Sequence, residues 1–382
     1  MKIVIAPQAF KGSISALDVA RAISEGVHRV EPTAKTVLVP VADGGDGTLE
    51  TLIEAIGGEV RTSPVTGPLG EKVKARWGAL KGETAMLEMA MSSGLALVPK
   101  EKRDPRITTT YGLGELITGA LDAGFRKFIV GIGGSATNDA GGGMAQALGI
   151  RLLDRHGKDL PPGGMALATL DRIDVSGLDA RVREADFQVA CDVSNPLTGP
   201  RGASAVYGPQ KGATPEMVKD LDAALKHFAQ VVARDIGVDI DEVPGAGAAG
   251  GLGGGMIAFV GGKLRRGVDI VLDTVGIDDQ LEGADLVITG EGQLDFQTVF
   301  NKAPIGVAWR AQERGIPVIA ISGSLGQGFT DVHKHGIAAA SPIVNSPMTL
   351  EDASARAGEL LASAAEQALR YMKVGAQVYA RK

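Results

Sequence analysis

The stretch that decides the fold is Lys2-Ile3-Val4-Ile5-Ala6, a short and mostly apolar run near the start of the chain. After a polar turn, Ser15 and Asp18 form a Ser-x-x-Asp pattern, which is typical of the beginning of a helix. The apolar residues that follow recur at helical spacing, namely Leu17, Ala20, Ile23 and Val27. The sequence therefore predicts a strand, a loop and a helix in this order.

The same alternation returns directly afterwards and again near the end of the chain. Residues 36–41 are followed by an Asp/Gly-rich loop at 43–47 and by apolar residues at helical spacing from 49 to 56. Residues 286–289 and 318–321 resemble buried parallel strands, and a crossover helix is expected over 304–314. Both ends of the chain therefore indicate one doubly wound, Rossmann-like α/β domain.

The middle of the chain has a different sequence pattern. Between residues 59 and 98, short apolar runs are separated by Gly-Pro and Lys-Gly turns, which favours a meander of antiparallel strands. Further strands are expected at 128–132 and 187–191, and a helix from Thr214-Pro215 onward. We therefore predict two α/β domains, a discontinuous Rossmann-like domain of residues 1–65 and 278–382 and an inserted mixed α/β domain of residues 66–277.

The composition is that of an ordinary globular protein and excludes several classes of partner. Hydrophobic residues make up 44% and charged residues 22% of the 382 positions, so a disordered or fibrous chain is not expected. The formal net charge is -6 and no long basic run occurs, which argues against nucleic acid as a main partner. The single cysteine, Cys191, and five histidines leave no Cys-rich framework for structural zinc.

The apolar stretches give an expectation about location. The first apolar run ends at Pro7 and is too short for a secretory signal. The longest uncharged stretch, residues 243–262, is rich in glycine and poorly suited to a membrane helix. We therefore expect a cytoplasmic protein that neither spans nor binds a membrane.

Glycine is about twice as frequent as usual, with 54 residues in 382, and one glycine string follows a predicted strand. The string is Gly131-Ile132-Gly133-Gly134-Ser135-Ala136, and a short helix is expected after it. Backbone amides of such a loop, together with the hydroxyls of Ser135 and Thr137, can bind a phosphate. The alternative is a tight turn between a strand and a helix with no ligand.

The same string leaves a dehydrogenase open as an alternative function. Asp154 ends the next apolar run, about where a dinucleotide-binding fold places the acid that contacts the ribose. No His-Asp or Tyr-Lys pair that would serve hydride transfer stands out in the sequence. An NAD(P)-dependent dehydrogenase acting on a small hydroxy acid is therefore the second hypothesis.

A second glycine string, Gly245 to Gly250, fits the dinucleotide pattern but does not follow a strand. With the glycines up to Gly255 it is either a flexible loop over a ligand or a closely packed helix start, and the sequence favours neither. No Gly-x-x-x-x-Gly-Lys-Ser/Thr string occurs, which disfavours a P-loop ATPase.

Acidic residues gather where predicted strands end, and three lysines lie near glycines. The acids are Asp43, Asp46, Asp139, Asp192, Glu291 and Asp295, and the lysines are Lys11, Lys211 and Lys302. Ligands of open parallel sheets bind at these strand ends, and several carboxylates beside a phosphate loop are consistent with Mg²⁺ between them. For any one Asp-Gly pair, a plain turn is the alternative, and for any one lysine, a solvated surface position.

Taken together, these segments resemble the bacterial type I glycerate kinases from the first strand to the C-terminal helix. The resemblance rests on motifs in a fixed order, which are Phe10-Lys11-Gly12-Ser13, Val41 to Gly45, Gly131 to Asp139, Ala190 to Val193, Asn195-Pro196-Leu197, Gly208 to Ala213, Gly245 to Gly255, Asp285 to Asp295 and Lys302 to Ala308. It implies ATP-dependent phosphorylation of D-glycerate, at the 2-hydroxyl to give 2-phosphoglycerate and ADP. It also implies two α/β domains with the active site in the cleft between them.

With this chemistry in view, we assign expected roles to individual residues. ATP is expected to contact Gly133, Gly134, Ser135, Thr137 and Lys302, and Lys11 to clamp a phosphate or a carboxylate. Mg²⁺ is expected at Asp43, Asp46 and Glu291. Asp192, with Asn195 beside it, is expected to accept the proton of the substrate hydroxyl. A nucleotide-sensing or carbohydrate-binding module is a non-enzymatic alternative, which release of ADP dependent on D-glycerate would exclude.

The chain departs from the family pattern at two places. It has Gln8-Ala9 where the family usually has Asp-Ser, and Asn301 where a glycine usually precedes the Lys302 motif. The first change removes a carboxylate, so that a neighbouring acid such as Asp43 must substitute for it or the substrate preference differs. The second affects a loop, where Asn is the residue that best tolerates a positive φ after glycine.

Overall fold

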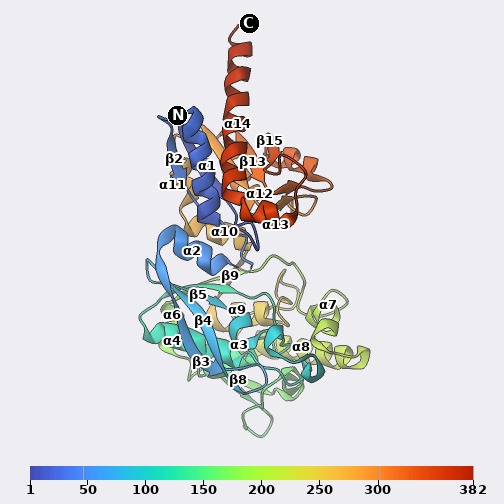
Figure 1. The fold of residues 1–382 in the computed structure, drawn as a ribbon. Coiled ribbons are helices and arrows are strands. Elements are labelled where there is room, and N and C mark those ends of the chain that lie inside the picture. The colour runs from blue at the N-terminus through green and yellow to red at the C-terminus, as the bar shows by residue number, and fades with distance from the viewer. Residues whose placement is uncertain (46, 301, 382) are drawn as a thin grey trace. The chain divides into compact units, whose positions relative to one another are not determined.

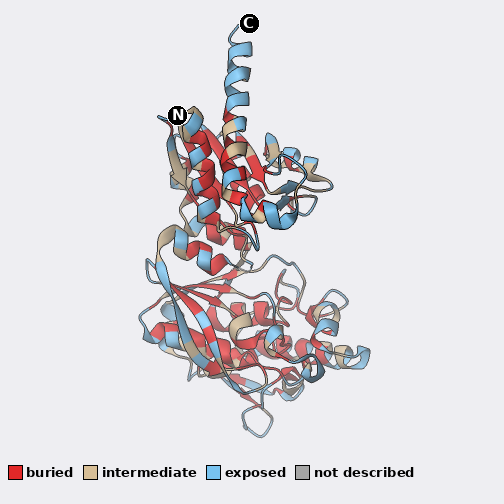
Figure 2. Cartoon of the chain, in the orientation of Figure 1, coloured by how far each residue is buried: buried red, intermediate tan, exposed pale blue. Residues whose placement is uncertain are grey.

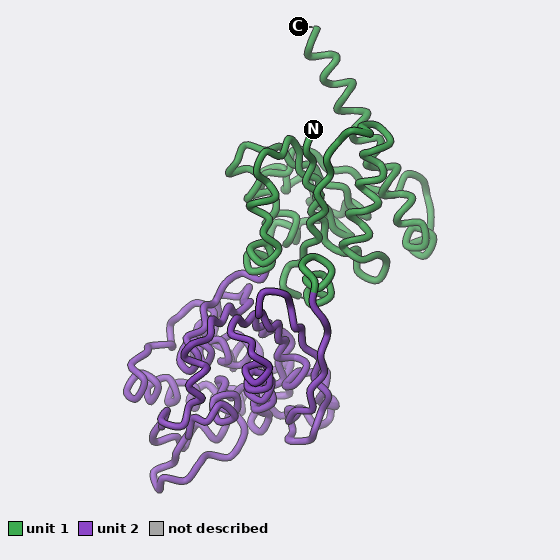
Figure 3. Tube along the Cα trace, turned by 90° about the vertical axis from the view of Figure 1, so that its left-hand side faces the viewer, with its two compact units in different colours: residues 1–57, 268–382 green, residues 58–267 purple. Residues whose placement is uncertain are grey.

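The chain divides into two compact units in a computed structural model that describes residues 1–45, 47–300 and 302–381 (Figure 3). Unit 1 contains residues 1–57 and 268–382, and unit 2 contains residues 58–267. The sequence placed the boundaries after residues 65 and 277 instead. The difference arises because the strand Gly58–Thr66 pairs along its whole length with unit 2, whereas Val268 and Leu272 pack in a core of unit 1. That each unit is a separate folding domain stays a prediction.

Unit 1 is built on a five-stranded parallel sheet with the order β15-β13-β11-β1-β2. Its strands are β1 (Lys2–Pro7), β2 (Lys35–Leu38), β11 (Leu286–Gly290), β13 (Val318–Ser322) and β15 (Ala339–Pro342). Taken in chain order, this is the doubly wound order 2-1-3-4-5, whose topological switch point lies between the first and third strands. The switch point of unit 1 therefore lies between β1 and β11.

Alternate residues of these strands face two separate cores, as expected for a sheet covered on both sides. Ile3 and Ile5 pack with helices α1 (Ala16–Val30) and α14 (Ala357–Tyr379), whereas Val4 and Ala6 pack with α10 (Gly267–Thr274), α11 (Ile277–Leu281) and α12 (Ala303–Gln312). Figure 1 shows α1 and α14 running side by side. Smaller elements complete the unit, namely α2 (Thr48–Ile56), α13 (Leu350–Ala355) and the paired short strands β12 (Gln293–Leu294) and β14 (Ser324–Leu325).

Helix α1 begins as the sequence predicts. Ser15 is its N-cap, and the Ser15 hydroxyl accepts a hydrogen bond from the Asp18 amide at 3.2 Å. Gly26 then lets α1 approach α14 closely, because a Cβ atom at this position would lie 2.1 Å from the Ala362 carbonyl oxygen. The local capping signal and one small residue thus fix the helix pair on this face of the sheet.

Unit 2 is built on a mixed six-stranded sheet with the order β10-β9-β6-β5-β4-β3. Its strands are β3 (Gly58–Thr66), β4 (Lys72–Leu80), β5 (Thr84–Glu88), β6 (Lys127–Gly131), β9 (Asp186–Ala190) and β10 (Lys263–Arg265). The predicted antiparallel meander is confirmed for β3, β4 and β5, after which β5, β6, β9 and β10 run parallel. One core of buried apolar side chains fills the unit (Figure 2).

The remaining elements of unit 2 are seven α-helices, four short 3-10 helices and a small two-stranded sheet. The α-helices are α3 (Ala90–Ser93), α4 (Tyr111–Asp122), α5 (Gly142–Ala147), α6 (Ala180–Glu184), α7 (Ala203–Tyr207), α8 (Pro215–Asp235) and α9 (Leu252–Val260). The small sheet pairs β7 (Arg151–Leu153) with β8 (Arg172–Asp174) in antiparallel fashion. In the described parts of both units, no helix combines the length and apolarity that crossing a membrane requires.

Candidate active site

Two of the predicted loops leave neighbouring strands of unit 2. Strands β6 and β9 pair in parallel, with Gly131 opposite Ala190. The Gly133 loop (residues 132–141) and the Asp192 loop (residues 191–202) therefore both start at the carboxyl edge of the sheet. Because ligands of parallel sheets bind at this edge, the sheet brings the predicted anion loop and the predicted proton acceptor to neighbouring places.

The Gly133 loop offers backbone amides at its exposed end. Gly133 and Gly134 are exposed, Gly134 has a φ of 72°, and no hydrogen bond within the described chain uses their amides. Ser135 is 7% exposed and Thr137 is fully buried. The Thr137 hydroxyl has no hydrogen-bond partner among the described residues. The loop thus combines free amide donors with an unsatisfied hydroxyl, which suits an anion.

A short helix follows the glycine string, as the sequence predicts. This helix is α5, which begins at Gly142, and residues 137–141 separate it from the string. The N-terminus of α5 is therefore not adjacent to the glycines. The reason is the carboxylate of Asp139, which accepts hydrogen bonds from the Gly143 amide at 3.2 Å and from the Thr110 amide and hydroxyl at 2.8 Å. This buried carboxylate ties the start of α4 to the start of α5, and burial raises its pKa.

A buried lysine lies beneath the Gly133 loop. The Lys211 ammonium group donates to the Ser135 hydroxyl and to the Thr137 carbonyl, each at 2.7 Å, and the residue is only 2% exposed. Burial lowers the pKa of Lys211 from 10.5 to about 7, an effect that the nearby Asp139 carboxylate partly opposes. The sequence marked Lys211 only as one of three lysines near glycine, because the packing that buries it is a property of the tertiary structure.

The second glycine string supports both loops of unit 2. A Cβ atom at Gly250 would lie 1.9 Å from the Thr137 carbonyl oxygen, and one at Gly247 would lie 2.1 Å from the Pro196 carbonyl oxygen. The Ala140 amide also donates to the Gly250 carbonyl at 3.1 Å. Of the two possibilities that the sequence left open, the closely packed segment is the observed one, since these glycines permit contacts that no side chain would allow.

Asp192 and Asn195 lie in the loop after β9 but differ in exposure and in their hydrogen bonds. Asp192 is exposed, and its Oδ1 atom accepts a hydrogen bond from the Gly267 amide at 3.0 Å. The Asn195 side chain is engaged at both ends, since its Nδ2 donates to the Arg201 carbonyl and its Oδ1 accepts from the Tyr207 hydroxyl, each at 2.7 Å. Asp192 is thus placed to meet a ligand, and Asn195 is placed to hold the loop.

The other predicted residues meet in a pocket of unit 1. This unit 1 pocket lies at the carboxyl edge of the parallel sheet and has a volume of about 580 Å³. Lys11, Asp43, Glu291 and Lys302 all line it. They come from the loops after β1, β2 and β11 and from the start of α12. Asp46, also predicted to bind metal, and Asn301 lie outside the described residues.

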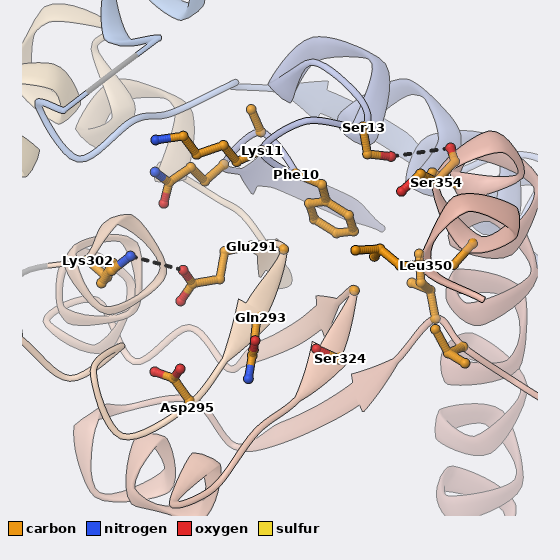
Figure 4. Close-up of a pocket in the computed structure, with 18 of the residues that line it drawn as sticks. Phe10, Lys11, Ser13, Glu291, Gln293, Asp295, Lys302, Ser324, Leu350 and Ser354 are labelled. Carbon is orange, nitrogen blue, oxygen red and sulfur yellow. Dashed lines mark hydrogen bonds and ion pairs between the residues drawn. The ribbon is translucent and has the colours of Figure 1, made fainter. Parts of the chain in front are cut away.

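Glu291 is the most strongly perturbed acid of the unit 1 pocket. It is 6% exposed, its Oε1 accepts a hydrogen bond from the Thr298 hydroxyl at 2.8 Å, and its Oε2 lies 3.7 Å from the Lys302 ammonium nitrogen. Burial, with smaller contributions from the charges of Asp43 and Asp295, raises the pKa of Glu291 to about 7, although Thr298 and Lys302 oppose the shift. Figure 4 shows Glu291 facing Lys302, with Asp295 on the same side of the pocket.

The unit 1 pocket also contains residues whose role the sequence did not predict. Gln8 lines it, and the Gln8 Oε1 atom is buried without a hydrogen-bond partner among the described residues. The sequence marked Gln8 only as a departure from the family pattern. Among the described residues, no group of three or more His, Cys, Asp or Glu side chains has the arrangement of a complete metal site. The carboxylates and the amide oxygen of Gln8 are nevertheless the oxygen donors that Mg²⁺ prefers, in the partial set typical of sites that a phosphate completes.

Asp154 does not have the position that the dehydrogenase alternative required. The strand before it, β7, pairs with β8 in a separate small sheet and not beside β6. The Asp154 carboxylate accepts from the His156 and Lys158 amides, at 2.8 and 2.9 Å, in an exposed turn. A ribose acid has to follow the strand next to the glycine loop, so the spacing in the sequence was coincidental.

Comparison with known proteins shows the family to which the chain belongs. The profile of the glycerate kinase family matches residues 3–373. The chain belongs to the glycerate kinase family. A glycerate kinase of Halalkalibacterium halodurans is 52% identical over 95% of this chain and 96% of its own length. A glycerate 2-kinase of Escherichia coli is 51% identical over 92% of this chain and 93% of its own length.

A solved structure has the same fold as this family member. It is the crystal structure of a protein assigned as glycerate kinase 2 in Salmonella typhimurium LT2, with 50% identity, a TM-score of 0.90 and 99% coverage of both chains. The family resemblance and the α/β fold class expected from the sequence are thereby confirmed. The chain is a kinase by family, and these relatives give no support to the dehydrogenase alternative.

Proposed function

We propose that this protein transfers the γ-phosphoryl group of ATP to the 2-hydroxyl of D-glycerate and releases 2-phosphoglycerate and ADP. The observation that carries the proposal is the unit 1 pocket, where Lys11, Lys302, Asp43 and Glu291 come together from separate loops. Two cations and two acids in one pocket match a magnesium-bound phosphate. The choice of the 2-hydroxyl rests on the 51% identity with the glycerate 2-kinase of Escherichia coli.

The Gly133 loop is proposed to bind phosphate through its backbone. The amides of Gly133 and Gly134 point to no acceptor in the described chain, and Ser135 and Thr137 add hydroxyls. The buried Lys211 ammonium group beneath them adds positive charge. Lys302 and Lys11, which line the unit 1 pocket, are proposed to neutralise further phosphate oxygens.

Asp43, Asp46 and Glu291 are proposed to hold Mg²⁺. The fit is supported by the oxygen donors of Asp43 and Glu291 in one pocket and by the unsatisfied Oε1 of Gln8 beside them. When bound, the ion neutralises phosphate charge that the acids alone would repel. Lys302 then keeps Glu291 oriented through their 3.7 Å contact.

Asp192 is proposed to accept the proton of the substrate hydroxyl. The hydroxyl oxygen forms a bond to the γ-phosphorus while the bond between that phosphorus and the oxygen of ADP breaks, and the hydroxyl proton passes to the Asp192 carboxylate. The Gly267 amide donates a hydrogen bond to the Asp192 Oδ1 atom and thereby orients the carboxylate. Asn195 positions this loop through Arg201 and Tyr207.

The test is a measurement of products on the wild-type protein. With ATP and Mg²⁺, ADP release should depend on D-glycerate. It should not occur with hydroxy acids that lack a hydroxyl on C2. Phosphorus NMR then locates the phosphate, because a phosphate on C2 couples to one proton and a phosphate on C3 couples to two. Absence of D-glycerate-dependent ADP release would overturn the proposal. The cytoplasm stays the predicted location.

A further inference from the structure

We propose that the unit 1 pocket binds the nucleotide base, with the adenine at its apolar end and the phosphates toward Lys11 and Lys302. This inference rests on the proposed function and deepens it, since the sequence assigned ATP to the Gly133 loop and to Lys302 and named no residues for the base. It is carried by the pocket's two chemically different ends.

One end of the pocket is apolar. Its buried wall consists of Phe10, Ile343, Ala353 and Ala357, which are 5%, 3%, 9% and 3% exposed. Leu350 lies at the same end and is 84% exposed. A large apolar side chain at the mouth of a cavity gains stability when a flat apolar ligand covers it.

The other end of the pocket is charged. Lys11, Glu291, Asp295 and Lys302 line it, and Figure 4 shows Glu291, Lys302 and Asp295 on the side away from Leu350. A ligand that fills the pocket therefore needs an apolar end and a charged end. A nucleotide has both, whereas a three-carbon hydroxy acid has no apolar part to place against Phe10 and Leu350.

The size and position of the pocket lead to the same ligand. Its volume of about 580 Å³ lies within the range of about 300–1,000 Å³ that is usual for sites of drug-sized ligands, and glycerate would leave most of it empty. The pocket lies at the switch point between β1 and β11, where Gln8 and Glu291 follow the two strands. Doubly wound sheets bind nucleotides at this point because the loops diverge there and leave a crevice.

Polar groups at the apolar end can contact the edge of a base. The Ser13 hydroxyl donates to the Ser354 carbonyl at 3.3 Å, a long hydrogen bond that a ligand donor or acceptor can replace. Ser324 and Gln293 line the floor of the pocket, as Figure 4 shows. A mostly apolar wall with a few such groups is the usual composition of a base site.

Photolabelling of the wild-type protein tests the location directly. The probe is 8-azido-ATP, which attaches through the base, followed by mass spectrometry of the peptides. We expect the label on peptides that contain Phe10 to Ser13 or Ile343 to Ala357, with loss of labelling when unmodified ATP is added. Label confined to peptides of unit 2 would overturn the inference. Because ADP release with D-glycerate is measured separately on the same protein, failure of the proposed function remains distinguishable from failure of this assignment.

A cavity-filling variant gives a second test. Ala357→Leu places a larger side chain in the pocket, and Ala376→Leu is the matched control on an exposed position of the same helix, α14. We expect Ala357→Leu to weaken ADP binding, measured by titration calorimetry, at least about tenfold, and to leave the KM for D-glycerate unchanged. Equal ADP affinity of both variants, in proteins with unchanged circular dichroism, would contradict the inference.

Discussion

Each unit contains a buried titratable group whose pKa is shifted by burial to about 7, and the two groups, Lys211 in unit 2 and Glu291 in unit 1, have opposite charges. In unit 2, burial lowers the pKa of Lys211 to about 7. In unit 1, burial raises the pKa of Glu291 to about 7. Neighbouring charges offset the cost of burial only in part. Asp139 stabilises the charge of Lys211, and Lys302 stabilises the charge of Glu291, but Asp43 and Asp295 destabilise the latter.

This difference between the units matches the ligands proposed for them. A buried cation beneath a loop of free amides favours an anion, and a buried acid among further acids favours a cation. In both places the protein accepts a cost in stability for a charge that the ligand then neutralises. The pH dependence of stability should therefore have opposite signs for the two groups, which the first two predictions use.

The largest effect is expected for Lys211→Met. Below pH 7 the folded and unfolded proteins both carry the Lys211 charge, so folding bears its full burial cost; above the unfolded pKa of 10.5 the cost is absent. The interval from 10.5 to about 7 corresponds to about 5 kcal/mol. The free energy of unfolding of Lys211→Met relative to wild type should therefore fall by up to about 5 kcal/mol as pH rises from 7 to 10.5.

Urea denaturation between pH 6 and pH 10 measures this difference, and its slope with pH is insensitive to the hydrogen bonds that the variant loses. Lys219→Met is the control, because Lys219 is exposed on α8. A pH-independent difference for Lys211→Met would show that burial does not lower the pKa of Lys211.

A smaller effect of opposite sign is expected for Glu291→Gln. Below pH 4.5 the Glu291 carboxyl is neutral in both states, whereas above pH 7 folding buries its charge. The stability of the variant relative to wild type should therefore rise by up to about 3 kcal/mol as pH rises from 4.5 to 7. Gln keeps the oxygen that accepts the hydrogen bond from Thr298.

Metal-free denaturation at several pH values checks this prediction, with the exposed Glu54→Gln as control. If Glu291→Gln loses stability as pH rises over this interval, the contrast between the units disappears.

The comparison can also be sharpened through catalysis. Asp192→Asn removes the proposed proton acceptor of unit 2 and keeps an oxygen for the Gly267 amide. Loss of a general base lowers kcat by at least about a hundredfold, and ADP binding should stay normal. Steady-state kinetics measure this, with Asp186→Asn at the other end of β9 as control. Near-normal turnover of Asp192→Asn would show that Asp192 is not the proton acceptor.

The smallest effect is expected in the metal requirement. Glu291→Gln should raise the Mg²⁺ concentration for half-maximal ADP formation by about tenfold, which is the lower scale for disturbing a metal site. Glu54→Gln should leave it unchanged. An unchanged Mg²⁺ requirement of Glu291→Gln would contradict the proposal that Glu291 binds the metal.

Much of the fold could be predicted because its signals are local. The apolar runs that become β1, β11 and β13, the Ser15 cap of α1 and the helix after Thr214 are all confirmed. The candidate acids were found because parallel strands end at one edge, so a residue placed after a strand is also placed near the others. Their roles stay predictions.

Other features depend on packing between distant segments and have no local signal. The burial of Lys211 comes from its contacts with Ser135 and Thr137, far away in sequence. The apolar end of the unit 1 pocket joins Phe10 to Ile343 and Leu350, and neither Ile343 nor Leu350 belongs to a motif. The hydrogen bonds from the Thr110 and Gly143 amides to the buried Asp139 carboxylate likewise join segments that no local pattern connects.

The pairing of β1 with β11 has a consequence for synthesis on the ribosome. Ile3 lies opposite Leu286, so the first strand to be translated gains its central partner only near the end of the chain. At about 5–20 residues per second, this wait lasts about 15–60 s. Unit 2 is translated as one continuous stretch in that interval. Until β11 is synthesised, β1 must therefore not pair with strands of unit 2.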